Sequence, residues 1–169
     1  MANESTKKAQ ILGQIFIFIL AGLVFILIIM YGYKAINYFI ERQEQVVLVD
    51  FKTDLEIAIE GVKRDYGTVR KVELKLSNDY LGVCFVDPVT CASQTPTLIT
   101  ATQIQAPWAQ DSCQAHSANI VTIPRSQDIW TPDIQVDSPG YVCIPNTGKI
   151  EVRMEGTGKK TKISQWQTA

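Results

Sequence analysis

The chain has 169 residues, of which 46% are hydrophobic, a formal net charge of −1 and four cysteines. This length suits one ordinary domain with an additional segment, and no part of the chain is basic enough for a nucleic-acid surface, which excludes that class. The charge is unevenly spread, since residues 76–148 carry one basic and six acidic side chains while residues 149–169 carry five basic and two acidic.

The N-terminal region predicts a membrane anchor. Residues 1–9 form a short basic leader with Lys7 and Lys8, and residues 10–33 contain no ionisable side chain other than tyrosine. A helix of about 20 apolar residues spans the roughly 30 Å of a bilayer core, so a lipid bilayer is the first expected partner. No small-residue cleavage motif follows the apolar run, which argues against a removable secretory signal. The lysines place the N-terminus in the cytoplasm and the rest of this single-pass chain outside the cell.

Residues 34–66 predict an amphipathic helix that continues from the membrane segment. Apolar residues recur there at helical spacing, with charged residues between them: Phe51, Leu55, Ala58, Ile59 and Val62. The helix is expected to stop at Tyr66-Gly67, because glycine suits the left-handed position after a helix end. The β-branched Val46, Val47 and Val49 leave open a local break at residues 43–49.

Beyond this helix, residues 67–169 predict an exported, β-rich domain. Alternating residues indicate a hairpin over 71–86, and further strands are expected at 119–123, 141–144, 149–155 and 159–164, the last two joined by Gly156-Thr157-Gly158. Residues 87–117 predict loop with one short helical turn. The expected class is α+β, with a long N-terminal helix packed on a mainly antiparallel sheet.

All four cysteines follow the membrane segment, and an even number in an exported domain indicates two disulfides. Cys84 and Cys143 lie in apolar, strand-like sequence, whereas Cys91 and Cys113 lie in polar sequence. We therefore expect Cys84 to pair with Cys143 across strands, and Cys91 with Cys113 across a loop. The alternative is a structural zinc site, which the absence of a paired C-x2-4-C spacing disfavours.

The sequence Lys7-Lys8-Ala9-Gln10-Ile11, followed by the apolar helix, resembles the type IV pilin family and its archaeal pilin-like and archaellin relatives. The resemblance implies that a prepilin-peptidase-type enzyme cuts after Ala9, with Lys8 at the charged position and Gln10 as the mature N-terminus. It also implies a homo-oligomer held together by the N-terminal helices. Gln14 occupies the position of the glutamate of bacterial members, a departure that favours archaea. Its amide also suits an ordinary interhelical or interfacial hydrogen bond.

Catalytic and metal-binding motifs are weak. His116 lies near Cys113 and Asp111, but a Cys–His mechanism needs a free thiolate, and we expect Cys113 to be oxidised. Asp128, Asp133 and Asp137 lack the spacing of a compact calcium loop and predict a solvated acidic loop. The expectation is therefore no enzyme activity, no metal and no cofactor.

Two functions remain open from the sequence. The first is a pilin-like structural subunit of a cell-surface filament, assembled through the apolar helix. The alternative is a permanently anchored surface protein that binds a partner or ligand through the polar region 87–140.

Overall fold

The computed structural model describes the backbone of residues 3–99 and 103–166, and the side chains of residues 16–39, 46–99 and 103–166. The chain divides into two compact units, Met1–Glu44 and Gln45–Ala169, which are described separately below. The boundary falls inside the predicted amphipathic helix, so the second half of that helix belongs to the same unit as the β-rich part of the chain.

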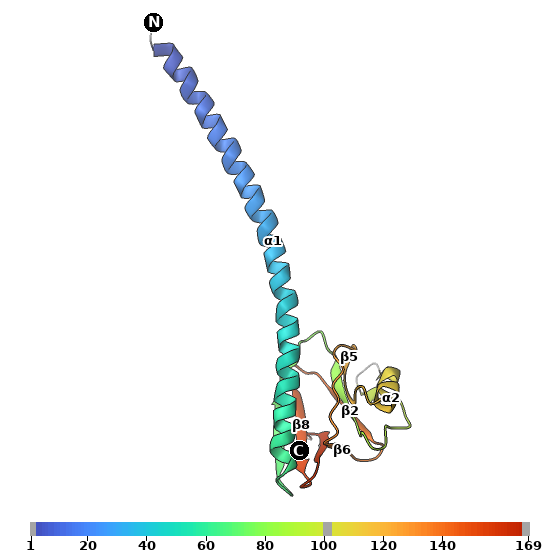
Figure 1. Ribbon diagram of the computed structural model, residues 1–169. Coiled ribbons are helices and arrows are strands. Elements are labelled where there is room, and N and C mark those ends of the chain that lie inside the picture. The colour runs from blue at the N-terminus through green and yellow to red at the C-terminus, as the bar shows by residue number, and fades with distance from the viewer. Residues whose placement is uncertain (1–2, 100–102, 167–169) are drawn as a thin grey trace. The chain divides into compact units, whose positions relative to one another are not determined.

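Helix α1 runs from Asn3 to Lys63 (Figure 1). Residues 43–49 are helical, so the break that their β-branched residues left open does not occur. The helix ends at Lys63 rather than at Tyr66, because Arg64 to Tyr66 already form a turn. Gly67 has a φ of 77°, which confirms its expected left-handed conformation.

The β-strands form two main sheets, in addition to a two-stranded pair. The four-stranded sheet has the order β1 (Val69–Leu74), β8 (Ile150–Gly156), β9 (Thr161–Gln165) and β6 (Ile134–Val136). The three-stranded sheet has the order β5 (Ile120–Ile123), β2 (Gly82–Val86) and β7 (Tyr141–Pro145). Strands β3 (Thr97–Leu98) and β4 (Ile104–Gln105) pair separately, just before helix α2 (Pro107–Gln114).

Two expectations about the strands are wrong. The predicted hairpin at 71–86 does not form, because β1 pairs with β8 and β2 pairs with β5 and β7 in the other sheet. Every residue of β2 is buried, so this strand takes partners on both edges, whereas β1 is mostly exposed. The segment expected to be an acidic loop contains β6, which pairs in parallel with β9; the other strand pairs are antiparallel within the described residues.

The main core forms between α1 and the sheets. Leu48, Phe51, Leu55, Ile59 and Val62 of α1 join one buried cluster with residues of β1, β8, β9, β2 and β5. Figure 1 shows β8 beside the C-terminal turns of α1. A β-carbon on Gly156 of β8 would collide with the backbone carbonyl oxygens of Val62 and Asp65, so glycine permits this close approach.

The three-stranded sheet is buried on both faces. Along β2, Val83 and Phe85 belong to the α1 core, whereas Cys84 and Val86 belong to smaller clusters that include α2 residues Ala109 and Cys113. Successive side chains of a strand point to opposite faces, so this alternation places α1 and α2 on opposite faces of the sheet. The expected short helical turn within 87–117 is confirmed as α2.

Candidate functional site

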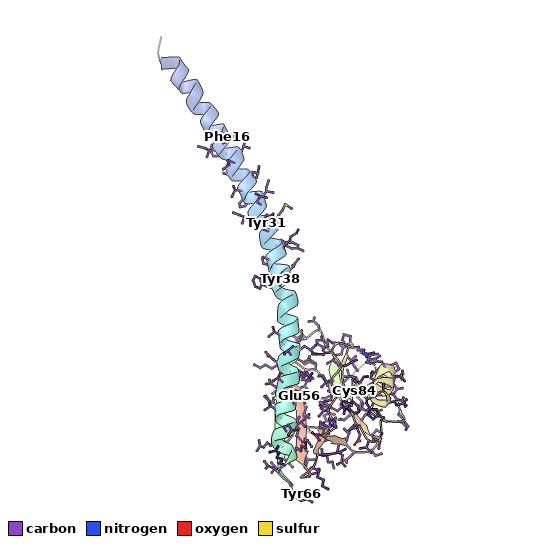
Figure 2. The ribbon with its side chains drawn as sticks, viewed as in Figure 1. Phe16, Tyr31, Tyr38, Glu56, Tyr66 and Cys84 are labelled. Carbon is purple, nitrogen blue, oxygen red and sulfur yellow. A yellow bond between two sulfur atoms is a disulfide. The ribbon has the colours of Figure 1, made fainter. Side chains whose placement is uncertain are left out.

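One helix among the described residues is long and apolar enough to cross a bilayer. Its window, Phe16–Phe39, has a mean hydropathy of 2.6, and none of it is buried. Figure 2 shows the side chains of this segment projecting on all sides of the helix. Tyr31, Tyr33 and Tyr38 lie near its C-terminal end and are all exposed. An apolar surface with no polar face requires lipid or other apolar helices around it.

The residues of the pilin resemblance lie at the start of α1. Lys8, Ala9, Gln10 and Gln14 are helical in their backbone, and their side chains lie outside the described part of the chain. The proposed cleavage after Ala9 and the proposed contacts of Gln14 therefore stay predictions.

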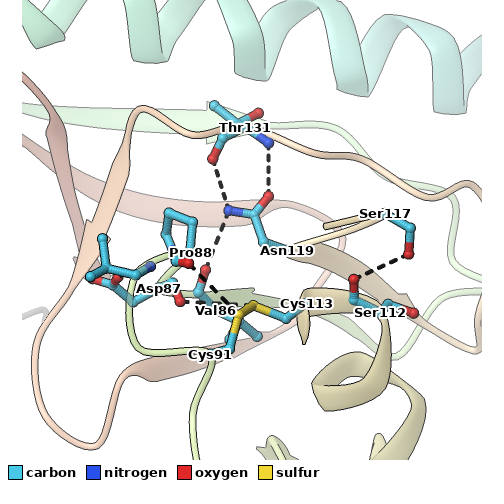
Figure 3. Close-up of a disulfide and its surroundings, with 10 residues drawn as sticks. Val86, Asp87, Pro88, Cys91, Ser112, Cys113, Ser117, Asn119 and Thr131 are labelled. Carbon is cyan, nitrogen blue, oxygen red and sulfur yellow. Dashed lines mark hydrogen bonds between the residues drawn. A yellow bond between two sulfur atoms is a disulfide. The ribbon is translucent and has the colours of Figure 1, made fainter. Parts of the chain in front are cut away.

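The cysteines are bonded in the expected pairs, Cys84 with Cys143 and Cys91 with Cys113. Cys84 and Cys143 lie directly opposite each other in the β2–β7 pair. The second disulfide joins the loop after β2 to α2 (Figure 3), and it closes a shorter stretch of sequence, with a separation of 22 residues against 59. Disulfides form and persist in oxidising environments, so these two bonds indicate that this part of the chain lies in one.

Two buried polar side chains hold the loops around the second disulfide, and the sequence alone did not single them out. Asp87 is only 6% exposed, and its carboxylate oxygens accept hydrogen bonds from the backbone N–H groups of Val89 and Val136, at 2.8 and 3.0 Å. Asn119 is fully buried and exchanges two 2.8 Å hydrogen bonds with the backbone of Thr131 (Figure 3). Both satisfy buried backbone groups, which is a structural role.

The side chains considered as catalytic or metal-binding residues contact protein groups that leave them no such role. Cys113 is bonded to Cys91, and the ring of His116 lies against Trp130 with 5.1 Å between centroids. Asp128, Asp133 and Asp137 each pair with a different cation, respectively Arg125, Lys63 and Lys162. The sequence predicted a solvated acidic loop, whereas each of these three carboxylates forms an ion pair. Within the described residues, no three metal-ligating side chains gather.

The solvent face of β1 and β8 carries a closed network of two lysines and two glutamates. Lys71 contacts Glu73 and Glu151 at 3.0 and 3.1 Å, and Lys149 contacts the same carboxylates at 3.0 and 2.7 Å. Hydrogen bonds from Lys71 and then Lys149 lower the pKa of Glu73, and those from Lys149 and then Lys71 lower the pKa of Glu151. The charge of the network is neutralised within itself.

This network predicts a loss of stability in acid. A lowered folded-state pKa means that the carboxylates stabilise the fold above their unfolded pKa of about 4.3, and that this contribution disappears as the pH falls through the folded values. We expect the thermal unfolding midpoint to fall less steeply below about pH 4.5 in the double variant Glu73→Gln/Glu151→Gln than in the wild type. The control is Glu56→Gln, on α1, where the carboxylate lies 4.0 Å from Lys52. Equal acid dependence in the double variant and the wild type would contradict this role.

Surface depressions lie among the described residues of the unit 45–169, and three of them bear on function. One has a volume of about 490 Å³ and a polar lining that includes Asp87, Thr90, Gln135, Asp137 and Lys160. A second, of about 350 Å³, is lined by Arg153, Ser164, Gln165 and Trp166. A third, of about 320 Å³, lies beside α1 at Asp50, Phe51, Asp54 and Lys75. The first lies largely in the region 87–140 where a ligand was expected.

No protein-family model, no curated protein and no solved structure matches the chain.

Proposed function

We propose that this protein is an exported, membrane-anchored structural subunit that assembles through its N-terminal helix into a pilin-like filament on the cell surface. The observation that carries the proposal is the apolar segment Phe16–Phe39, which is exposed on every side. In the membrane, lipid covers this surface. In an assembled fibre, the same segments of neighbouring copies cover one another, so that lipid contacts are exchanged for helix contacts.

The part of α1 in the second unit also supports contact between copies. Leu48, Phe51 and Leu55 form its buried side, whereas Val46, Val49 and Ile57 are more than half exposed on its other side. They share this side with the exposed polar residues Asp50, Thr53 and Glu60, so the side has separate apolar contacts rather than a continuous apolar stripe. A neighbouring helix would bury these three apolar side chains, and a solitary anchored protein would leave them in water.

The proposal also assigns the leader a role. Cleavage after Ala9 by a prepilin-peptidase-type enzyme would leave the apolar helix attached and remove both Lys7 and Lys8. Cleavage leaves a single α-ammonium group at Gln10 in place of the two lysines and the original N-terminus, so the cost of moving the N-terminal end of the helix away from the cytoplasmic interface falls. The helix is then able to leave the bilayer for the fibre.

The test is the intact mass of the protein from the membranes and from the sheared surface material of the producing cells. We expect a chain that starts at Gln10 and sediments as fibres in the sheared fraction. Replacing Ala9 with the bulky Leu is expected to retain residues 1–9 and abolish the fibres, whereas Asn3→Ala, a matched change within the leader, is expected to do neither. Wild-type protein that retains residues 1–9 and is found only in the detergent extract would overturn the proposal.

A permanently anchored binding protein is the second candidate. The specific observation in its favour is the 490 Å³ polar depression at Asp87, Asp137 and Lys160, since ligand pockets fall in the range of roughly 300–1,000 Å³. The same mass measurement separates the two, because this function requires the uncut leader.

A further inference from the structure

A row of polar side chains crosses the solvent face of the four-stranded sheet. Lys71 lies opposite Arg153 in the β1–β8 pair, and Arg153 lies opposite Ser164 in the β8–β9 pair. Trp166 is two residues beyond Ser164 and therefore emerges on the same face. Arg153, Ser164, Gln165 and Trp166 line the depression of about 350 Å³, and the Nζ atom of Lys71 lies 5.8 Å from the centre of the Trp166 ring.

The row brings two cations together on the solvent face of the sheet. Like charges directly opposite each other in a sheet are destabilising, and Lys71 and Arg153 form such a pair. Lys71 is neutralised by Glu73 and Glu151, in the closed network described above. Arg153 has one partner among the described residues, Glu155, through a single guanidinium nitrogen at 3.4 Å. Most of its five N–H donors remain available, so the depression has unused hydrogen-bond donors of a cation at its edge.

The strands around the depression are also the basic part of an otherwise acidic domain. Residues 149–169 carry a net charge of +3, whereas residues 76–148 carry −5. Of the five cations in residues 149–169, Arg153 lines this depression, whereas Lys160 lines the polar depression at Asp87.

The chemistry of the lining selects among anions. An indole ring offers an apolar face against which the C–H groups of a ring pack, a guanidinium binds a carboxylate through two parallel hydrogen bonds, and the hydroxyl of Ser164 binds a further polar group. A pyranose ring that carries a carboxylate meets all three requirements. We propose that the depression at Arg153, Ser164, Gln165 and Trp166 is a binding site for an acidic sugar, a uronate residue, whose ring lies on Trp166 and whose carboxylate contacts Arg153.

The site does not depend on the assembly of α1, since Arg153, Ser164 and Gln165 lie on β8 and β9 and Trp166 directly follows β9. It is tested by titrating the full chain, in lauryldimethylamine oxide micelles that contain no sugar, with methyl β-D-glucuronoside. The readout is the shift of the Trp166 indole N–H resonance, which is assigned by its loss in Trp166→Phe. Methyl β-D-glucoside tests the ring without the charge, and sodium acetate tests the charge without the ring.

The glucuronoside is expected to bind at least about tenfold more tightly than either the glucoside or acetate. Arg153→Gln is expected to weaken glucuronoside binding by about tenfold and to leave the weak glucoside shift unchanged. The control Arg125→Gln changes an arginine that is paired with Asp128 elsewhere, and it should bind the glucuronoside as the wild type does. Dispersed amide spectra of both variants establish that they fold.

Three results would overturn the proposal. They are an unchanged Trp166 resonance at saturating glucuronoside, acetate binding as tight as that of the glucuronoside, and full binding in Arg153→Gln. The second result would mean that the depression is a simple anion site, and the third that Arg153 does not bind the carboxylate.

Discussion

Replacing Phe51 with alanine is expected to lower the free energy of unfolding of the unit 45–169 by about 3–5 kcal/mol. Phe51 is 1% exposed, and it is one of the largest fully buried side chains in the core between α1 and the sheets. Its removal takes a large apolar area out of the core and leaves a cavity that neighbouring strands fill only in part. All three tryptophans lie at positions 108, 130 and 166, so their fluorescence during a urea titration of the full chain in micelles follows this unit alone.

The matched control is Ile57→Ala on the same helix. Ile57 is 65% exposed, so its truncation removes little packing, and we expect a change within about 0.5 kcal/mol. If Phe51→Ala unfolded at the same urea concentration as Ile57→Ala, this result would contradict the burial of Phe51 between α1 and the sheets. A membrane extraction of both variants should give equal yields, because neither change touches the apolar span.

The helical part of this fold could be predicted because its signals are local. The spacing of Phe51, Leu55, Ile59 and Val62 identifies the buried side of α1 without knowledge of what covers it. Strand partners are not a local property. Alternating residues suggested a hairpin over 71–86, yet β1 and β2 pair with strands that follow tens of residues later. Strand β6 has three residues, too few for alternation to be recognised.

The same distinction applies to the candidate sites. The disulfide pairing followed from the apolar or polar sequence around each cysteine, and the structure has the same pairs. Arg153 lies within the strand expected at 149–155, but its neighbours Lys71 and Ser164 are set by the registers of two strand pairs. Trp166 lies just beyond the strand expected at 159–164. Only the register brings it to the same depression as Arg153.

Removing the disulfide between Cys84 and Cys143 is expected to cost more stability than removing the one between Cys91 and Cys113. The sequence separations are 59 and 22 residues, and the entropy of the closed loop gives about 4.3 and about 3.4 kcal/mol, respectively. The double variants Cys84→Ala/Cys143→Ala and Cys91→Ala/Cys113→Ala avoid leaving an unpaired thiol. Urea titrations followed by tryptophan fluorescence should therefore separate them by about 0.9 kcal/mol.

The location of the two bonds predicts a second difference between these variants. Cys84 lies on β2, the central strand of the three-stranded sheet, and Cys143 lies on its hydrogen-bonded neighbour β7, so the loss of this bond is expected to lower the stability of the whole unit. Cys113 lies on α2 and Cys91 in the loop after β2, so the loss of this bond should also increase amide hydrogen exchange in residues 107–114 before the rest of the unit unfolds. Peptide mapping without reduction gives the control, since each variant must retain the other bond. Equal protection of α2 in the two variants would contradict the assignment of Cys91–Cys113 as the bond that holds this helix against β2.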